Sequence, residues 1–189
     1  MRVISGLKKG HRLKSPKGLD VRPTEDRIKE SLFNILGTIH PESIVLDLFA
    51  GSGAIGIEFL SRGALKSYFV DISPLSLAVV KENLIHTGFL ESSQLIKMEA
   101  NKAILQFNKS NLKFDYIFLD PPFNNKDLLL NIIEVINNNQ VLSTEGIIII
   151  EHEKDLILED NLGDLIKYKS KNYGRIALDF YNMHNIRRG

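Results

Sequence analysis

Cysteine is absent from this 189-residue chain, which excludes disulfides, thiolate metal sites and cysteine nucleophiles. Long apolar runs are missing as well. The run Ile147–Ile150 has four residues, whereas a membrane-spanning helix needs about 20. No segment has the pattern of a signal peptide. Because the length suits one domain with a substantial core, we expect a single, soluble cytoplasmic domain that is monomeric.

The net charge of +1 hides an uneven distribution along the chain. Residues 1–22 contain seven basic residues and one acid, and residues 166–189 contain six basic residues and one acid. Residues 23–165 are acidic, with 11 basic and 21 acidic side chains. Basic ends can bind a polyanion, but the same pattern also fits two solvated surface segments. Charge alone leaves the choice open.

From residue 44 onward, short β-rich runs alternate with segments whose apolar residues recur every three or four positions. The predicted strands of this part are 44–49, 67–71, 94–98, 116–120 and 147–151. Such alternation predicts an α/β fold with a parallel sheet and helices on both faces. Two last strands, 165–171 and 175–181, flank Asn172-Tyr173-Gly174, a hairpin signal. We expect a Rossmann-like, mostly parallel sheet of seven strands that ends in an antiparallel hairpin.

The residues before the first strand form a separate piece. Residues 1–13, within a basic extension of 1–22, predict a small hairpin that turns near residues 6–10. A leading helix from about Glu25 to Leu36 follows within 23–40, with Thr24 as its N-cap and Gly37 at its end. Residues 41–189 would then form the cofactor-binding catalytic core.

A glycine loop follows the first predicted strand. Gly51, Gly53 and Gly56 match G-x-G-x-x-G, and Asp71 lies 20 residues beyond Gly51. This is the spacing of the dinucleotide-binding fingerprint, so an NAD-dependent oxidoreductase is one interpretation. Asp47, four residues before the first glycine, argues against it: a carboxylate suits an amino-acid ammonium group but not a pyrophosphate.

S-adenosylmethionine is therefore the predicted cofactor. The glycines would let the backbone approach its methionine and ribose portions, and Asp71 would accept hydrogen bonds from the ribose hydroxyls. We also expect no second domain that would hold an oxidisable substrate. The cofactor-binding residues predicted from this region are Asp47, Phe49, Gly51, Ser52, Gly53, Asp71 and Ile72.

The run Asp120-Pro121-Pro122-Phe123 follows the fourth predicted strand, and ligands of open parallel sheets bind beyond such carboxyl ends. We expect it to meet the glycine loop there. An exocyclic base amine is a poor nucleophile because its lone pair is delocalised into the ring. The Asp120 carboxylate and the Pro121 carbonyl can accept its two N–H groups and free that lone pair. Consecutive prolines offer no competing N–H, and Phe123 offers a face for base stacking. Such a transfer needs no metal.

The chain resembles the bacterial 16S ribosomal RNA guanine-N2 methyltransferases of the RsmD type nearly end to end. The resemblance is carried by Arg2-Val3-Ile4-Ser5-Gly6, by Arg22-Pro23-Thr24-Glu25-Asp26-Arg27 with Ser31-Leu32-Phe33-Asn34, by 46–53, by 60–64, by 120–123 and by Tyr173-Gly174. It implies transfer from S-adenosylmethionine to guanine N2 of 16S rRNA in the small ribosomal subunit. It also implies an RNA-binding role for the N-terminal segment, where the candidate residues are Arg2, Lys8, Lys9, Arg12, Arg22 and Thr24.

The resemblance further places Asn101 where such enzymes contact the adenine, although Glu99 competes for that role. His152 is predicted to be a surface or packing residue. The Asp-Pro-Pro-Phe run alone would also fit a methyltransferase of DNA adenine or protein glutamine, and a catalytically idle RNA-binding module is a further alternative.

Overall fold

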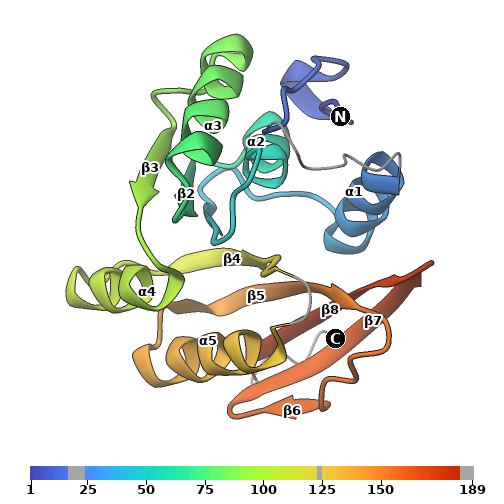
Figure 1. Cartoon of the computed structure of the whole chain (residues 1–189), viewed down its shortest axis with the longest axis vertical. Helices are drawn as coiled ribbons and strands as arrows, with labels where there is room; N and C mark the ends of the chain where they lie inside the picture. The colour runs from blue at the N-terminus through green and yellow to red at the C-terminus, as the bar shows by residue number, and fades with distance from the viewer. Residues whose placement is uncertain (17–23, 123–124, 184–189) are drawn as a thin grey trace. The chain divides into compact units, whose positions relative to one another are not determined.

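A computed structural model describes residues 1–16, 24–122 and 125–183, without the side chains of Thr24 and Glu25. The chain divides into two compact units, Met1–Glu99 and Ala100–Gly189. Each unit has its own layer of strands with helices beside it (Figure 1). The predicted glycine loop belongs to the first unit, and the Asp-Pro-Pro run belongs to the second.

The first unit is a small parallel sheet with its helices. Its strands are β1 (Ile44–Asp47), β2 (Lys66–Asp71) and β3 (Ser93–Lys97), in the order β3-β2-β1. Both pairings are parallel, and the register of β1 with β2 runs from Ile44 opposite Lys66 to Asp47 opposite Phe69. The helices of this unit are α1 (Thr24–Leu36), α2 (Ala54–Ser61) and α3 (Pro74–Thr87).

Local sequence explains how these helices begin and end. α3 starts at Pro74 after Ser73, whose hydroxyl accepts a hydrogen bond from the Ser76 amide, and it stops at Gly88 in the left-handed conformation. α2 is apolar on nearly all sides, and seven of its eight residues are buried. A helix without a polar face belongs in a core, and α2 contributes Ala54, Ile57 and Leu60 to the core cluster of the first unit.

The N-terminal segment 1–16 is a hairpin-like loop that packs on the first unit. An antiparallel bridge joins Arg2 and Arg12, and the 3₁₀ helix η1 (Gly6–Lys8) lies at the turn. Val3 and Leu13 are 1% and 6% exposed and belong to one core cluster with residues of α2 and α3. The predicted basic hairpin is therefore present, but its apolar side chains make it part of the core.

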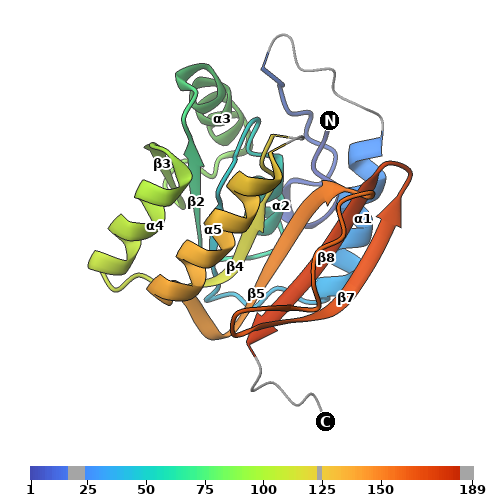
Figure 2. The same ribbon diagram turned by 60° about the horizontal axis from the view of Figure 1, so that its bottom comes forward.

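The second unit contains the remaining strands and helices. Its strands are β4 (Phe114–Leu119), β5 (Leu142–Glu153), β6 (Asn161–Leu162), β7 (Leu165–Tyr173) and β8 (Ile176–Met183), in the order β4-β5-β8-β7-β6. β4 and β5 are parallel, whereas β5–β8, β7–β8 and β6–β7 are antiparallel. Helices α4 (Ala100–Lys109) and α5 (Lys126–Asn139) lie side by side along β4 and β5 (Figure 2).

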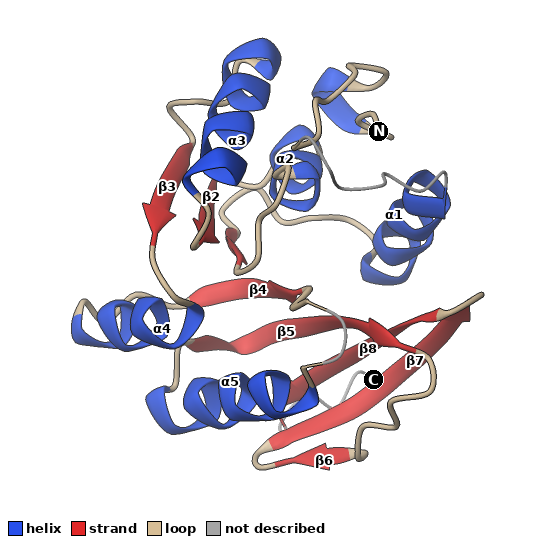
Figure 3. Cartoon of the chain, viewed as in Figure 1, coloured by secondary structure: helices blue, strands red, loops and turns tan. Residues whose placement is uncertain are grey.

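The predicted α/β class, the predicted strands and the terminal antiparallel hairpin are confirmed. The strand count differs, because the structure has eight strands in the described residues instead of seven. Figure 3 shows β6 as a short strand beside β7. The additional strand, β6, has only two residues and is too short to leave a periodic pattern in the sequence.

α1 begins at Thr24, so Thr24 is the first helical residue and not the predicted N-cap. No described helix is long and apolar enough to cross a membrane.

Candidate active site

The glycine loop connects β1 to α2 and depends on its glycines. Gly51 and Gly53 have φ angles of 53° and 76°, in the left-handed region that other residues rarely adopt. A Cβ atom at Gly56 would lie 2.3 Å from Cε1 of Phe69, a buried residue of β2. The first two glycines therefore shape the turn, and the third lets α2 pack closely on the sheet.

Asp47 ends β1 beneath this loop. It is 2% exposed, and its Oδ2 accepts a hydrogen bond of 3.1 Å from the Gly56 amide. A carboxylate at this point stabilises one of the unpaired amides in the first turn of α2. This structural role was not foreseen from the sequence, and the predicted contact with a cofactor ammonium stays a prediction.

Asp71 ends β2 and reaches the same loop. Its Oδ2 accepts the Gly51 amide at 2.9 Å, and its Oδ1 accepts the Ser73 amide at 2.8 Å. A carboxylate has about four acceptor positions, so two remain for other donors. Asp71 is thus a half-buried residue beside the loop, and its predicted contact with the ribose hydroxyls stays a prediction.

Apolar side chains lie next to Asp71 and are open to solvent. Ile72 is 64% exposed and Leu75 is 75% exposed. Phe49, Gly51 and Ser52 on the loop are half-buried. A partly exposed acid, a glycine turn and apolar side chains are the groups that an adenosine needs, since they suit ribose hydroxyls and the faces of a base. The residues of the first unit therefore fit S-adenosylmethionine.

Asn101 belongs to α4, in the second unit. Its Nδ2 donates to Oδ1 of Asn131 on α5 at 2.5 Å, and its own Oδ1 is buried with no hydrogen-bond partner among the described residues. A buried acceptor of this kind suits a ligand amine. Glu99, its competitor, is exposed. The assignment of Asn101 to the adenine stays a prediction.

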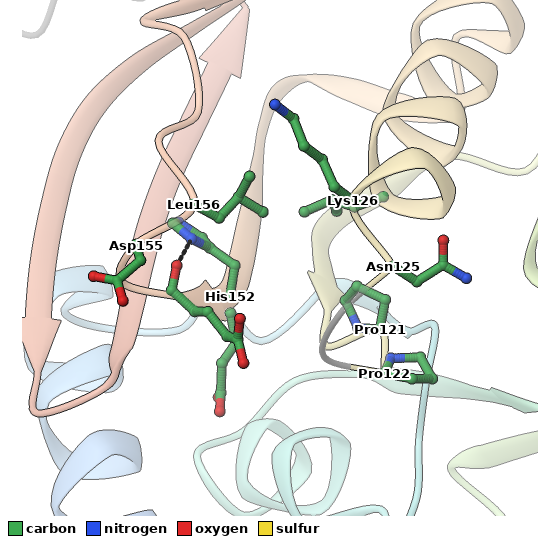
Figure 4. A pocket seen from close by; sticks show the side chains of 10 residues that line it. Pro121, Pro122, Asn125, Lys126, His152, Asp155 and Leu156 are labelled. Atoms are coloured by element: carbon green, nitrogen blue, oxygen red, sulfur yellow. Dashed lines mark hydrogen bonds between the residues drawn. The ribbon is translucent and has the colours of Figure 1, made fainter.

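A pocket of about 290 Å³ opens in the second unit at the end of β4. Pro121 and Pro122 form one side, and the turn that carries Asp155 and Leu156 lies across from them (Figure 4). Pro121 is buried, whereas Pro122 is exposed. The residues that line the pocket are Pro121, Pro122, Asn125, Lys126, Leu129, Glu151, His152, Glu153, Asp155 and Leu156. Asp120, half-buried, directly precedes the proline pair.

His152 lines this pocket and is buried. It was predicted to lie either at the surface or packed in the interior, and the second placement is correct. It is 4% exposed, and its Nε2 lies 3.3 Å from Oδ2 of Asp179 on β8. The ammonium group of Lys167 lies 3.1 Å from the same oxygen. Burial acts to raise the pKa of the Asp179 carboxyl, but the polar side chains of His152, Ser170 and Lys167 outweigh it and lower that pKa.

The same cluster anchors the chain after β5. Lys167 donates from Nζ to the Leu158 carbonyl at 2.6 Å, and the buried Tyr181 donates from its hydroxyl to the Glu159 carbonyl at 2.8 Å. These two bonds hold residues 158–159, a few positions beyond the pocket residues Asp155 and Leu156. The cluster was missed in the sequence because its members are far apart along the chain.

Two buried polar residues attach the N-terminal segment to the first unit, and neither was predicted. Glu58 of α2 is fully buried and accepts the amides of Ile4 and Ser5 at 2.7 and 3.0 Å. Asn83 of α3 is 1% exposed and bonds both the amide and the carbonyl of Lys14, and it also donates to the Ser52 carbonyl at 2.9 Å. Asn83 thus connects the N-terminal segment to the glycine loop.

The predicted RNA-binding residues differ in their surroundings. Arg2 pairs with Asp26 at 3.0 Å, and the Lys8 ammonium lies 6.0 Å from the ring centroid of Phe89. Lys9 and Arg12 are exposed. Phe123 and Arg22 lie outside the described residues, as does the side chain of Thr24.

No group of three or more potential metal ligands occurs within the described part of the chain.

A protein-family model described as conserved hypothetical protein 95 matches residues 1–182. The chain belongs to this family. Among its relatives is "Putative rRNA methyltransferase YlbH" of Bacillus subtilis, 39% identical over 96% of this chain and 98% of the relative. "Ribosomal RNA small subunit methyltransferase D" of Haemophilus influenzae is 34% identical over 96% and 93%.

A solved structure resembles the family member described here over almost its full length. "Putative methyltransferase yhhF from Escherichia coli" superposes with a TM-score of 0.83 and 29% identity, and covers 97% of each chain. The Rossmann-like methyltransferase fold is therefore confirmed. The residue assignments within the site rest on the geometry above and on the prediction from the sequence.

Proposed function

We propose that the chain is an S-adenosylmethionine-dependent methyltransferase that modifies N2 of a guanine in 16S rRNA of the small ribosomal subunit. The observation that carries the proposal is the pocket beside Asp120-Pro121-Pro122 in a chain that matches small-subunit rRNA methyltransferases over 96% of its length. The names of these relatives give the rRNA substrate, and the chemistry of the pocket favours a base amine.

The first unit would hold the cofactor. Asp71 would accept the ribose hydroxyls through its two remaining acceptor positions, and Ile72 would pack on the adenine. The glycines at 51 and 53 leave the loop open to close approach of the methionine portion. In the second unit, the buried Oδ1 of Asn101 is an acceptor that suits an amine. When bound, the cofactor supplies an electrophilic methyl group on its sulfonium.

The second unit would orient the acceptor. Asp120 and the Pro121 carbonyl accept the two N–H groups of the base amine, which directs the nitrogen lone pair away from the ring. Pro121 has no N–H that would compete for the carbonyl or donate to the amine. Phe123 stacks on the base, with a contribution of about 1–3 kcal/mol. Positioning of the two reactants supplies most of the acceleration.

The N-terminal segment would contact the RNA backbone through its exposed cations. Val3 and Leu13 pack in the core, so deletion of residues 1–22 would damage the fold as well as RNA binding. The variant Lys9→Ala/Arg12→Ala tests the charge alone. We expect it to weaken binding to small subunits and to lower the slope of log K against log salt by about 1.4 to 1.8 units. An unchanged slope would assign the segment a purely structural role.

The function itself is tested by transfer of labelled methyl groups to small subunits from cells lacking the enzyme, followed by nucleoside analysis. The expected product is N2-methylguanosine. Parallel reactions with DNA and with a glutamine-containing release factor test the other acceptors of an Asp-Pro-Pro-Phe enzyme. Label in either of them, and none in rRNA, would refute the proposal. NAD binding without S-adenosylhomocysteine binding would support an oxidoreductase instead.

Asp120→Ala separates acceptor chemistry from cofactor binding. Transfer should fall by roughly 100-fold or more because the amine loses its orientation, while calorimetry should find S-adenosylhomocysteine affinity within a few-fold of the unmodified protein. Asp164→Ala, at an exposed turn between β6 and β7, is the matched control and should behave like the parent. Loss of cofactor binding in Asp120→Ala would count against the assigned role.

A further inference from the structure

Two carboxylates lie near the carboxyl ends of the neighbouring strands β4 and β5, with Asp120 directly after β4 and Glu151 within β5. The parallel register of β4 and β5 pairs Leu119 with Ile150. One residue further along each strand are Asp120 and Glu151. Neighbouring strands lie about 4.8 Å apart, and paired residues point to the same face of a sheet. The register therefore places Glu151, a half-buried residue that lines the pocket, beside the residue that orients the amine.

A second carboxylate at this position distinguishes between base amines. N6 of adenine and N4 of cytosine each adjoin a ring nitrogen that has a lone pair and no proton. N2 of guanine adjoins N1, which carries a proton. A carboxylate next to the amine site accepts a hydrogen bond from a ring N–H but repels a lone pair. Its presence favours guanine and disfavours the other two bases.

A cation lies at the edge of the same pocket. Lys126 is the first residue of α5, and its side chain extends into the space between α5 and the turn that carries Leu156 (Figure 4). Its ammonium makes no ion pair or hydrogen bond with the described residues. The third group on the Watson–Crick edge of guanine is O6, an acceptor, whereas adenine presents an amine there. A lysine donor complements O6.

We propose that Glu151 and Lys126 select guanine, with the Glu151 carboxylate accepting N1–H and the Lys126 ammonium donating to O6. Asp120 and the Pro121 carbonyl hold N2. Enzymes that act on a base outside the helical stack recognise its Watson–Crick edge by such hydrogen bonds. This inference rests on the proposed function, because it presupposes a base in the pocket.

The test uses small subunits reconstituted with rRNA in which the target guanine, first located with the unmodified enzyme, is replaced by 2,6-diaminopurine. This base keeps the 2-amine but has an unprotonated N1 and an amine in place of O6. We expect kcat/KM of the unmodified enzyme to be about 100-fold or more lower on 2,6-diaminopurine than on guanine, because a site built for an N–H rejects a base that lacks it.

Glu151→Gln should change this preference. A glutamine can donate an N–H to the unprotonated N1, so transfer to 2,6-diaminopurine should rise while transfer to guanine falls about 10- to 100-fold. Glu145→Gln, on an exposed part of β5 outside the pocket, is the matched control. It should keep the ratio of kcat/KM on guanine to kcat/KM on 2,6-diaminopurine of the unmodified enzyme. Unchanged S-adenosylhomocysteine binding would show that the Glu151 variant is folded.

Lys126→Met provides an independent test with 6-thioguanine, which keeps N1–H and N2 but has a weak acceptor in place of O6. Transfer to guanine should fall about tenfold, and transfer to 6-thioguanine should fall less than about threefold. Equal losses on both bases would overturn the role of Lys126. If Glu151→Gln leaves the ratio of kcat/KM on guanine to kcat/KM on 2,6-diaminopurine unchanged, the role of Glu151 is overturned. If the unmodified enzyme forms no N2-methylguanosine, the proposed function fails instead.

Discussion

Replacement of Glu58 by glutamine tests the most buried ionic cluster of the first unit. Glu58 is 0% exposed and bonds the Ile4 and Ser5 amides. Its carboxylate lies 2.9 Å from Nε of Arg62 and 3.8 Å from Nζ of Lys29, whose side chain is 3% exposed. Glutamine keeps one acceptor oxygen but removes the negative charge that faces the buried Lys29 ammonium, and that loss dominates the expected effect.

Removal of one partner of a buried ion pair costs about 3–5 kcal/mol. The Arg62 side chain retains 17% exposure and can recover part of its hydration, so we expect a loss near the lower limit, about 3 kcal/mol. For a chain of this size each kcal/mol lowers Tm by about 2–4 °C. Glu58→Gln should therefore lower Tm by about 6–12 °C.

The assays are urea denaturation followed by circular dichroism and differential scanning calorimetry. Glu30→Gln, an exposed residue of α1 next to Lys29, should change the free energy of unfolding by less than about 0.5 kcal/mol. The double variant Glu58→Gln/Lys29→Met also removes the buried Lys29 ammonium and should be more stable than Glu58→Gln alone. The reasoning fails if Glu58→Gln unfolds within about 0.5 kcal/mol of the parent.

Three further predictions use other contacts. Gly56→Ala should lower the free energy of unfolding by about 1–3 kcal/mol, measured in urea, because the new Cβ would meet the buried Phe69 ring at 2.3 Å. Asn83→Ala should weaken S-adenosylhomocysteine binding in calorimetry, since the Ser52 carbonyl of the glycine loop loses its donor; unchanged affinity would contradict this. The pKa of Asp179 is lower in the folded chain than its usual value, so its stabilising effect is complete above the usual pKa of about 3.9 and is lost as pH falls through the folded value. The difference in stability between the parent and Asp179→Asn should therefore be larger at pH 7 than at pH 3.

Regular patterns in the sequence were sufficient to predict most of the fold. Each strand of four residues or more was predicted, because its apolar residues are contiguous or alternate. The spacing of Asp71 from the glycine loop marked it as a candidate ribose-binding residue, whereas its hydrogen bond with the Gly51 amide was found only in the structure.

The sequence was a weaker guide to polar residues whose partners are distant. Glu58 has its amide partners 53 and 54 positions earlier, and Asn83 contacts Lys14 across 69 positions. A charged residue inside the apolar α2 was the available signal for Glu58, since such a helix has no solvent-facing side. Glu151 required the register of β4 with β5, which no property of the sequence specifies to a single residue.

The attachment of the N-terminal segment also sets the order in which the chain can fold during synthesis. The segment is translated before its anchors Glu58 and Asn83, which follow 53 to 69 residues later. Until then Val3 and Leu13 have no core to enter. This segment is thus fixed only after the helices that hold it have been made, and long-range closure of this kind slows folding. A nascent chain shorter than about 90 residues should leave this segment open to proteolysis.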